Sequence, residues 1–317
     1  MSAPSPFITI FTAPKPFTNP HISLIQRNAI QSWQHLGKDV QVLIIGDEPG
    51  MADFIAETGI QQLPHVSRNE QGTPLVSSIF DLARRNSASP LLAYVNADIL
   101  LMPDAISLAR MIYNLSKEFL IVGQRWDLDV RLALDFSPNW DARLLQEAKT
   151  NGRLHPPGGS DYFIFPRNCF TEIPGFAIGR AGWDNWMFYH ARQKSCPVID
   201  VSSSLTVIHQ EHDYSHLPGG QPHYQMPESI KNIHLAGGRR TIFTLLDADY
   251  TFHSGKLQRI PLRGKRFWRN LETYPLIRWK SYPLAELAFA LCHPGKAFGE
   301  WRGRLMYKLN QYRHRPA

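Results

Sequence analysis

Cysteine is scarce in this 317-residue chain, and its three cysteines, Cys169, Cys196 and Cys292, are widely separated. Three thiols are too few for a disulfide framework, and none stands at the paired spacing of a zinc ribbon. We therefore expect free thiols and a protein of the reducing cytoplasm.

Long apolar runs are also missing. No run approaches the roughly 18 residues that a membrane-spanning helix needs, and the start MSAPSPFITIF lacks the basic and long apolar parts of a secretory signal. Internal repeats and low-complexity segments are absent from the sequence. With 43% hydrophobic and 19% charged residues, the composition predicts a globular protein that is not integral to a membrane.

Acidic residues are few toward the C-terminus. From Lys256 onward the chain has 14 Lys and Arg against 3 Asp and Glu, a net +11, whereas residues 1–255 have 20 against 24, a net -4. Large apolar and aromatic residues are interleaved with these basic residues, which favours a membrane-surface segment over a nucleic-acid-binding tail.

We therefore predict two domains, a main domain over residues 1–255 and a basic, aromatic-rich helical extension over residues 256–317. The extension would dock on an anionic membrane surface, the inner face of the membrane for a cytoplasmic protein, and no nucleic acid is expected as a partner. The alternative stays open that its aromatic side chains pack on the main domain and its basic groups face solvent.

Strand and helix patterns alternate along the main domain. Short β-branched and aromatic runs predict buried strands, and apolar residues at helical spacing predict the helices between them. The strands are expected near residues 7–11, 40–45, 63–66, 91–95, 119–123, 162–166, 198–201 and 205–209, and the helices near 20–36, 52–57, 75–85, 103–116 and from 182 onward. This alternation predicts an α/β fold with a mostly parallel sheet flanked by helices. From about residue 217 the pattern becomes irregular.

Polar side chains follow three of the predicted strands where each strand ends. Thr12 follows the first, Asp47 the second, and Asn96 with Asp98 the strand LeuLeuAlaTyrVal. In parallel α/β sheets ligands bind at the carboxyl ends of the strands. We expect these side chains to share one ligand site, although Asn and Asp after a strand are also common turn residues.

The strand ending TyrValAsnAlaAspIleLeu resembles the Asp-x-Asp site of the A-type glycosyltransferases, with Asn96 in place of the first Asp. The resemblance covers roughly residues 7–216 and is closest to bacterial family 2-like sequences. It implies a Rossmann-like catalytic domain that moves a sugar from a nucleotide-sugar donor to an acceptor that the motifs do not identify. Docking of the basic extension on a membrane would be consistent with a lipid-linked glycan or a growing envelope polysaccharide as the acceptor.

The resemblance also implies roles for single residues on the donor side. Asp98 would bind a divalent metal that bridges the donor diphosphate, together with His209 as first choice or His212 as second. Mn²⁺ and Mg²⁺ both suit such ligands, and imidazole favours Mn²⁺. The remaining donor contacts would come from Thr12, Asp47, Asn96, Gly159 and Asp161.

On the acceptor side, GlyTrpAspAsnTrp resembles the acidic motif that supplies the catalytic base of inverting members. Asp184 would be that base, with Trp183 and Trp186 as stacking faces for a sugar. Asp161 is the competing base. Asp184 is alternatively a simple helix N-cap, because carboxylates suit a helix N-terminus.

Two other functions stay open. The first is a zinc hydrolase, because the spacing of four side chains suits zinc binding: His209, His212, Asp213 and His216. The internal Glu of a metalloprotease motif is missing, however, and Pro218 argues against a helix in this segment. A catalytically silent interaction module at a membrane is the other, because Asn96 departs from the acidic motif. A nucleotidyltransferase is disfavoured, since ThrAlaProLysProPhe after the first strand has no phosphate-binding glycines.

Overall fold

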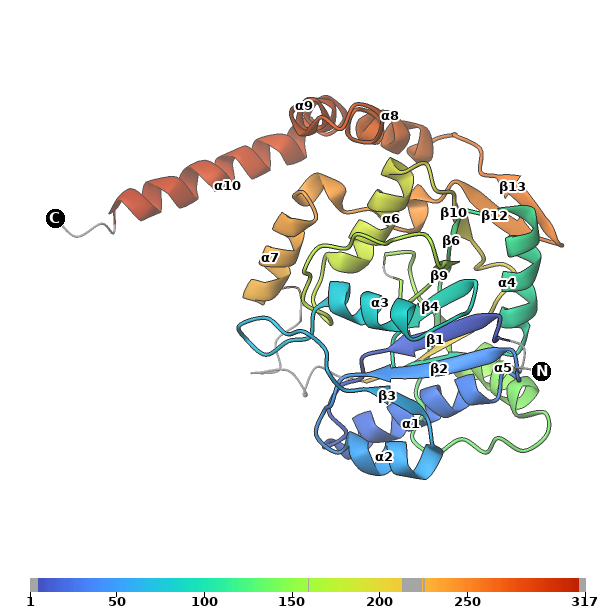
Figure 1. Cartoon of the computed structure of the whole chain (residues 1–317). Helices are drawn as coiled ribbons and strands as arrows, with labels where there is room; N and C mark the ends of the chain where they lie inside the picture. Colours follow the sequence, from blue (N-terminus) through green and yellow to red (C-terminus); the bar gives the residue numbers. More distant parts are fainter. Residues whose placement is uncertain (1–4, 159, 213–223, 225, 314–317) are drawn as a thin grey trace. The chain divides into compact units, whose positions relative to one another are not determined.

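A computed structural model describes residues 5–158, 160–212, 224 and 226–313 of the chain, with backbone alone at 304 and 307–313 (Figure 1). These residues form two compact units, which divide between Ile260 and Pro261. Each unit is described by itself.

The first unit is built on a nine-stranded sheet in the order β13-β12-β10-β6-β9-β4-β1-β2-β3. All of its strands run in one direction except β9 and β13. Its strands are β1 (Ile8–Thr12), β2 (Val40–Ile45), β3 (Gln61–Leu63), β4 (Leu91–Val95), β6 (Leu120–Val122), β9 (Tyr162–Pro166), β10 (Val198–Asp200), β12 (Tyr250–His253) and β13 (Lys256–Arg259). The predicted mostly parallel α/β sheet is confirmed.

A smaller sheet carries the order β5-β11-β7-β8. Its strands are β5 (Ile99–Leu101), β7 (Trp126–Leu128), β8 (Arg153–Leu154) and β11 (Val207–Gln210). Strand β11 runs antiparallel to β5 and parallel to β7. Three segments far apart in the sequence therefore lie side by side.

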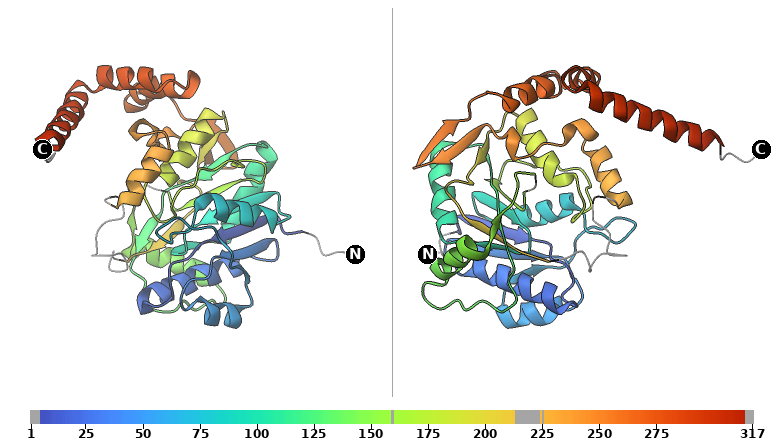
Figure 2. Two further views of the ribbon diagram at one scale, coloured as in Figure 1. Left: turned by 60° about the vertical axis from the view of Figure 1, so that its left-hand side comes forward. Right: turned by 180° about the vertical axis from the view of Figure 1, so that it is seen from behind.

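Helices cover both faces of the large sheet (Figure 2). The helices of the first unit are α1 (Pro20–Gln34), α2 (Met51–Thr58), α3 (Val76–Arg85), α4 (Asp104–Leu115), α5 (Trp140–Asn151), α6 (Trp183–Gln193) and α7 (Pro227–Leu235), with short 3-10 turns at Arg239–Thr241 and Leu245–Asp247. Asn19 caps α1 through its side-chain oxygen, which accepts from the backbone of His21 and Ile22.

The period of two along each strand divides the core into two layers. Alternate residues of β1 and β4 pack with α1, α2 and α4 on one face. On the other face Phe11 and Tyr94 meet Phe80 of α3, and Tyr94 also meets Trp183 of α6. The aromatic layer thus lies between the sheet and the helices α3 and α6.

Three features differ from the expectations. Strand β9 is antiparallel to both of its neighbours, and the helix α7 lies within the stretch that the sequence pattern predicts to be irregular. The expected domain division after residue 255 falls inside the β12–β13 hairpin, because Lys256–Arg259 pairs with Tyr250–His253 and so completes the sheet.

The second unit, Pro261–Ala317, contains three helices in its described residues: α8 (Lys265–Arg278), α9 (Tyr282–Cys292) and α10 (Pro294–Arg313). The expected helical extension is therefore present. Three of its prolines are compatible with these helices, since Pro275 lies within α8 and Pro283 and Pro294 stand in the first turns of α9 and α10.

In the described part of the chain no helix is both long and apolar enough to cross a bilayer. The three cysteines are free thiols, as expected.

Candidate active site

Asp98 lies in the turn that joins β4 to β5. Strand β5 pairs with β11, so that Ile99 faces His209, and the amide of Gln210 donates to the carbonyl of Asp98 at 3.0 Å. The buried Gln210 side chain is anchored in turn by Asn28 of α1 and by the carbonyl of Ile25. Backbone pairing and a buried amide therefore fix His209 beside Asp98.

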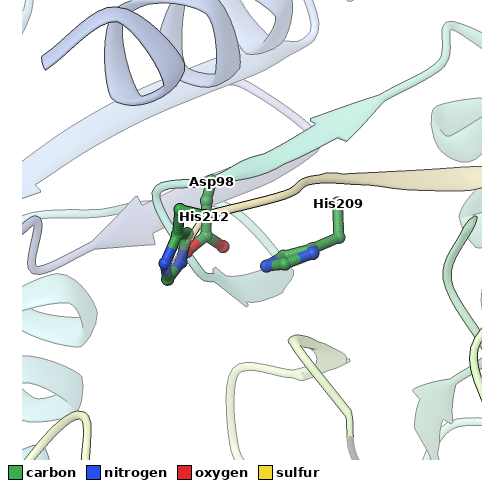
Figure 3. Close-up of side chains that lie close together, drawn as sticks. All are labelled: Asp98, His209 and His212. Atoms are coloured by element: carbon green, nitrogen blue, oxygen red, sulfur yellow. The ribbon is translucent and has the colours of Figure 1, made fainter. Parts of the chain in front are cut away.

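Asp98, His209 and His212 form one group, whose candidate ligand atoms lie within 4.8 Å of one another. Figure 3 shows the three side chains converging, with the His209 ring pointing toward the other two. Asp98 is only 7% exposed, and within the described residues its Oδ1 atom has no hydrogen-bond partner. A buried carboxylate oxygen without a partner is costly unless a ligand satisfies it.

The sequence analysis expected Asp98 with one histidine, His209 or else His212, and the structure brings both histidines close to Asp98. Oxygen and imidazole donors in this number suit Mn²⁺, and they also leave positions open for a donor or water. The unsatisfied Asp98 oxygen and the convergence of the two rings fit a divalent ion.

Lys15, on the loop after β1, adds a positive charge to the same group. Its Nζ atom lies 3.4 Å from Asp98 Oδ2 and 3.0 Å from His212 Nε2, which itself lies 3.1 Å from Asp98 Oδ2. Burial alone would raise the pKa of Asp98, but Lys15 and His212 hold it well below its usual value. Asp98 is thus ionised and ready to bind a cation at neutral pH.

Asp127 of β7 stands behind His209. The two residues are direct partners in the parallel β7–β11 ladder, and His209 Nδ1 lies 3.2 Å from Asp127 Oδ1, within ion-pair distance although not aligned as a hydrogen bond. Contact at Nδ1 leaves Nε2 of His209 to face the group. Carboxylates behind histidine ligands orient the ring and raise its basicity.

Further charged groups meet at Asp127, whose side chain is only 4% exposed. His155 Nδ1 lies 2.8 Å from Oδ2, and the Nε atom of Arg125 donates to Oδ1 at 3.0 Å. Burial opposes ionisation, but these contacts and that of His209 hold the pKa of Asp127 well below its usual value.

Arg125 connects this cluster to Asp161, with which it forms an ion pair. The amide Nδ2 of Asn96 donates to Asp161 Oδ1 at 3.0 Å, and Asn96 Oδ1 accepts from the Tyr94 hydroxyl at 3.0 Å. The backbone amide of Asn96 also donates to the Asp161 carbonyl, at 2.8 Å. A continuous polar network therefore runs from Tyr94 to the histidines.

Asp184 lies in the first turn of α6 and is partly buried. Burial is the main cause that raises its pKa to about 6, and the negative charge of nearby Asp161 also raises it. Hydrogen bonds from backbone amides lower the pKa but only in part offset this rise. A carboxyl group with this pKa changes protonation state close to neutral pH, as a general base needs.

Trp183 and Trp186 do not offer the open stacking faces that the sequence suggested. Each is only 5% exposed. Trp183 makes edge contacts with Tyr94 and Phe163 in the aromatic core layer, and Trp186 stacks on His190 with ring centroids 4.4 Å apart. Trp183 packs against residues of β4 and β9, whereas Trp186 packs against Phe176 and His190, so neither indole has an open face for a sugar.

The remaining donor-side residues lie at the strand ends where they were expected. Thr12 ends β1 and is buried, and its hydroxyl has no hydrogen-bond partner among the described residues. Asp47 follows β2, is exposed and accepts a hydrogen bond from Gln62 at 3.4 Å. Gly159 lies outside the described residues, as do Asp213, His216 and Pro218 of the zinc hypothesis.

Three site residues escaped the sequence analysis: Lys15, Asp127 and His155. Asp127 stands after a predicted strand in GlnArgTrpAspLeuAspVal, but nothing local separates it from Asp129, which is exposed and pairs with Arg131 at 2.6 Å. Lys15 stands in the proline-containing loop after β1. Only the tertiary structure brings these side chains to Asp98 and His209, through strand pairing for Asp127 and through side-chain contacts for Lys15 and His155.

No protein-family model matches the sequence, and no curated protein matches it either. Among solved structures, the mannosyltransferase PcManGT from Pyrobaculum calidifontis, in complex with GDP-Man and Mn²⁺, is 12% identical with a TM-score of 0.39 over 64% of this chain and 56% of its own. TarS 1–349 from S. aureus is 8% identical with a TM-score of 0.42 over 65% of this chain and 60% of its own. The chain thus spans less than two thirds of either structure.

A glucosyl-3-phosphoglycerate synthase from Mycobacterium tuberculosis, in complex with Mn²⁺, UDP and glucosyl-3-phosphoglycerate, is 12% identical with a TM-score of 0.45. The match covers 81% of this chain and 88% of that one.

Proposed function

We propose that the chain is a metal-dependent glycosyltransferase that moves a sugar from a nucleotide-sugar donor to an acceptor hydroxyl. The observation that supports this most is the convergence of Asp98, His209 and His212 beside the carboxyl ends of β1 and β4. In parallel α/β sheets this edge is where ligands bind.

Asp98, His209 and His212 would hold a divalent ion, with Mn²⁺ favoured over Mg²⁺ because two donors are imidazoles. Such an ion, when bound, stabilises the negative charge that develops on a leaving diphosphate. Lys15 supplies a further positive charge beside Asp98 for the same diphosphate. Thr12 and Asp47, at the ends of the two neighbouring parallel strands, are proposed to contact the nucleoside.

Asp184 is proposed as the general base of an inverting reaction. Its carboxylate takes the proton of the acceptor hydroxyl while that oxygen forms a bond to the anomeric carbon of the donor. The bond from this carbon to the diphosphate oxygen breaks, and its electron pair leaves with the nucleoside diphosphate. The pKa of about 6 makes Asp184 both ionised and basic at neutral pH.

Asp161 suits sugar binding better than proton transfer. Both of its carboxylate oxygens are engaged, one by Asn96 and the other by Arg125. A carboxylate held on both sides keeps a fixed orientation, and its remaining lone pairs can accept from sugar hydroxyls. Asn96 then acts through Asp161 as well as at the donor.

The acceptor is proposed to be a glycan or a lipid-linked glycan, for example in polysaccharide biosynthesis at the cytoplasmic face of a membrane. This part rests on the basic and aromatic character of the second unit and is separable from the chemistry of the first.

Thermal shift with a panel of UDP-, GDP-, dTDP- and CMP-sugars tests the function, each with and without Mn²⁺. A true donor raises the melting temperature with increasing concentration, and the rise depends on the metal. The donor so identified is then incubated with candidate acceptors, and release of the nucleoside diphosphate is followed. If no nucleotide sugar shifts the melting temperature in the presence of Mn²⁺, the proposal is wrong.

A zinc-dependent hydrolase remains the second candidate, because two imidazoles and one carboxylate also match the ligand set of catalytic zinc sites. Elemental analysis separates the two functions. Zinc that stays bound at one equivalent after dialysis favours the hydrolase, whereas exchangeable Mn²⁺ favours the transferase.

A further inference from the structure

Helix α8 of the second unit carries an exposed apolar stripe. Phe267, Leu271 and Tyr274 are 48%, 49% and 44% exposed, and their spacing of four and three residues places them on one face of the helix. Leu276 is buried on the opposite face. The helix therefore shows apolar side chains both toward the unit and away from it.

Helix α9 repeats this arrangement. Leu284, Leu287 and Leu291 follow one another at intervals of three and four residues along one face, and they are 43%, 56% and 75% exposed. Ala285 and Phe289 are buried on the other side. Three leucines in one exposed row are unusual, because leucine on an ordinary surface occurs singly.

Helix α10 has a third stripe at the same spacing. Phe298, Trp301 and Leu305 are 62%, 58% and 43% exposed. Trp268 within α8 and Trp279 at its end add two further indoles, 58% and 61% exposed. Aromatic rings with a polar edge prefer the boundary between a membrane and water.

The charge of this unit complements the apolar stripes. From Pro261 to the end it has 12 Lys and Arg against 3 Asp and Glu, a net +9. Glu272, one of the three acidic residues, is buried, forms an ion pair with Arg269 at 3.0 Å and lies 3.0 Å from the ring nitrogen Nε2 of His293. Very little negative charge therefore remains to oppose an anionic partner.

We propose that α8, α9 and α10 form a docking surface for an anionic lipid bilayer, with the three stripes inserted at the headgroup level. Basic residues attract the helices to the anionic surface, and the aromatic and leucine side chains then leave water. The helices lie in the interface instead of crossing it, since no helix in the described residues can span a bilayer.

Two other binding partners would account for fewer of the apolar and basic features of α8, α9 and α10. A second copy of the chain would bring its own excess of positive charge to the contact, which opposes association. A nucleic acid would use the basic residues, but rows of leucine offer nothing to a phosphate backbone.

The test is co-sedimentation of the full chain with vesicles of phosphatidylcholine alone or mixed with phosphatidylglycerol, at about 50 mM and about 500 mM salt. The stripe variant combines four exposed positions of α9 and α10: Leu287→Ser, Leu291→Ser, Phe298→Ser and Trp301→Ser. The matched control removes four exposed apolar side chains of the first unit, which are 44% to 78% exposed: Met111→Ser, Leu115→Ser, Leu132→Ser and Ile230→Ser.

A second pair of variants tests the charge. Lys296→Glu with Arg302→Glu reverses two exposed positive charges on α10, and Lys38→Glu with Lys149→Glu does the same on the first unit. All variants are compared with the original chain by circular dichroism, so that loss of binding is separated from loss of folding.

We expect the original chain and both first-unit controls to bind anionic vesicles at low salt and to lose most binding at high salt. The stripe variant and the α10 charge variant should each bind at least about tenfold more weakly. The inference is overturned if the original chain ignores anionic vesicles, if it binds neutral vesicles equally well, or if the folded stripe variant binds like its control.

Two further measurements address the other occupants. A dimer in sedimentation analysis that the stripe variant converts to monomer, with no vesicle binding, assigns the stripes to a second copy. Binding of single-stranded RNA that does not depend on the stripes, again without vesicle binding, assigns the unit to nucleic acid. Both results overturn the inference, and neither depends on whether the first unit transfers sugars.

Discussion

His209 and Asp127 are partners in the parallel ladder of β11 and β7, and the imidazole Nδ1 lies 3.2 Å from the carboxylate Oδ1. Asp127 therefore sets the direction in which the His209 ring faces Asp98. Because His155 and Arg125 hold the same carboxylate, its position does not depend on a bound ligand.

Asp127→Asn is expected to weaken Mn²⁺ binding by about 10-fold to 100-fold, because the amide no longer raises the basicity of His209 or fixes its orientation. Titration calorimetry with Mn²⁺ measures this directly and needs no donor or acceptor. Asp129→Asn is the control, since Asp129 is exposed and paired with Arg131. Equal affinities for the two variants would contradict a positioning role for Asp127.

Asp98→Asn should abolish Mn²⁺ binding, because it replaces the buried anionic ligand by a neutral amide of the same shape. Mn²⁺-dependent donor binding should disappear with it. Circular dichroism should remain unchanged, since the backbone contacts of Asp98 with Gln210 are kept. Retained metal dependence in this folded variant would show that the site lies elsewhere.

Asp184→Asn is expected to lower kcat by about 100-fold to 10,000-fold while leaving donor affinity almost unchanged, as for the loss of a general base. In the original chain, kcat/KM should rise with pH through about 6 and then level off, because only the ionised carboxylate takes the proton. Parallel losses of kcat and of donor affinity would instead indicate a structural role at the start of α6.

The same group links stability to pH. Its folded pKa of about 6 exceeds the ordinary 3.8, so the folded state binds the proton more tightly, and the resulting stabilisation is present at low pH and is lost as pH rises to about 6. Asp184→Asn should therefore raise the melting temperature at pH 8 more than at pH 4. The corresponding free energy is at most about 3 kcal/mol, and an equal shift at both pH values would speak against a raised pKa.

Asn96→Asp, which would recreate the Asp-x-Asp pattern, should destabilise the protein. The ionised carboxylate introduced by this change cannot donate to Asp161 and would place two negative charges about 3.0 Å apart, where Asn96 now donates. We expect a loss of roughly 1–3 kcal/mol in unfolding free energy at pH 8, and a smaller loss at pH 4. Urea denaturation at both pH values measures the difference, and Asn96→Ser controls for loss of the amide without added charge.

Trp183→Ala should cost about 3–5 kcal/mol of stability, because it leaves a cavity in the aromatic layer. Trp183→Phe should cost less and leave the acceptor KM almost unchanged. An exposed sugar-stacking residue would behave in the opposite way, with a large rise in acceptor KM and little change in stability. Denaturation combined with acceptor kinetics distinguishes these cases.

The local patterns of β1, β2 and β4 and of helices α1 and α3 identify them from the sequence, because apolar spacing alone specifies them. The direction of β9 is not encoded in its own five residues, since a buried strand has the same composition in either orientation. Helix α7 was missed because the Pro-, Gly- and His-rich residues before it obscure its beginning at Pro227.

The site residues likewise divide into those that a local sequence pattern identifies and those that only the tertiary structure reveals. Asp98 could be found because it lies in the short turn after the apolar strand β4, which ends at Val95, and His209 because it lies near the end of β11. Asp127 is 82 residues from His209 in the sequence, and the two meet only through strand pairing. Trp183 and Asp184 are adjacent, yet one packs in the core and the other reaches the site, a difference that depends on how α6 is rotated against the sheet.

The reversed direction of β9 has a consequence for how this protein can diversify. Tyr162, the first residue of β9, pairs with Val95, the last residue of β4. The beginning of β9 and the end of β4 therefore lie at the same edge of the sheet, beside Asn96. An insertion ahead of Asp161 would lengthen the connection at this edge and leave every β9 pairing in register. Length variation ahead of Asp161 can therefore change the surroundings of this carboxylate without repacking the sheet.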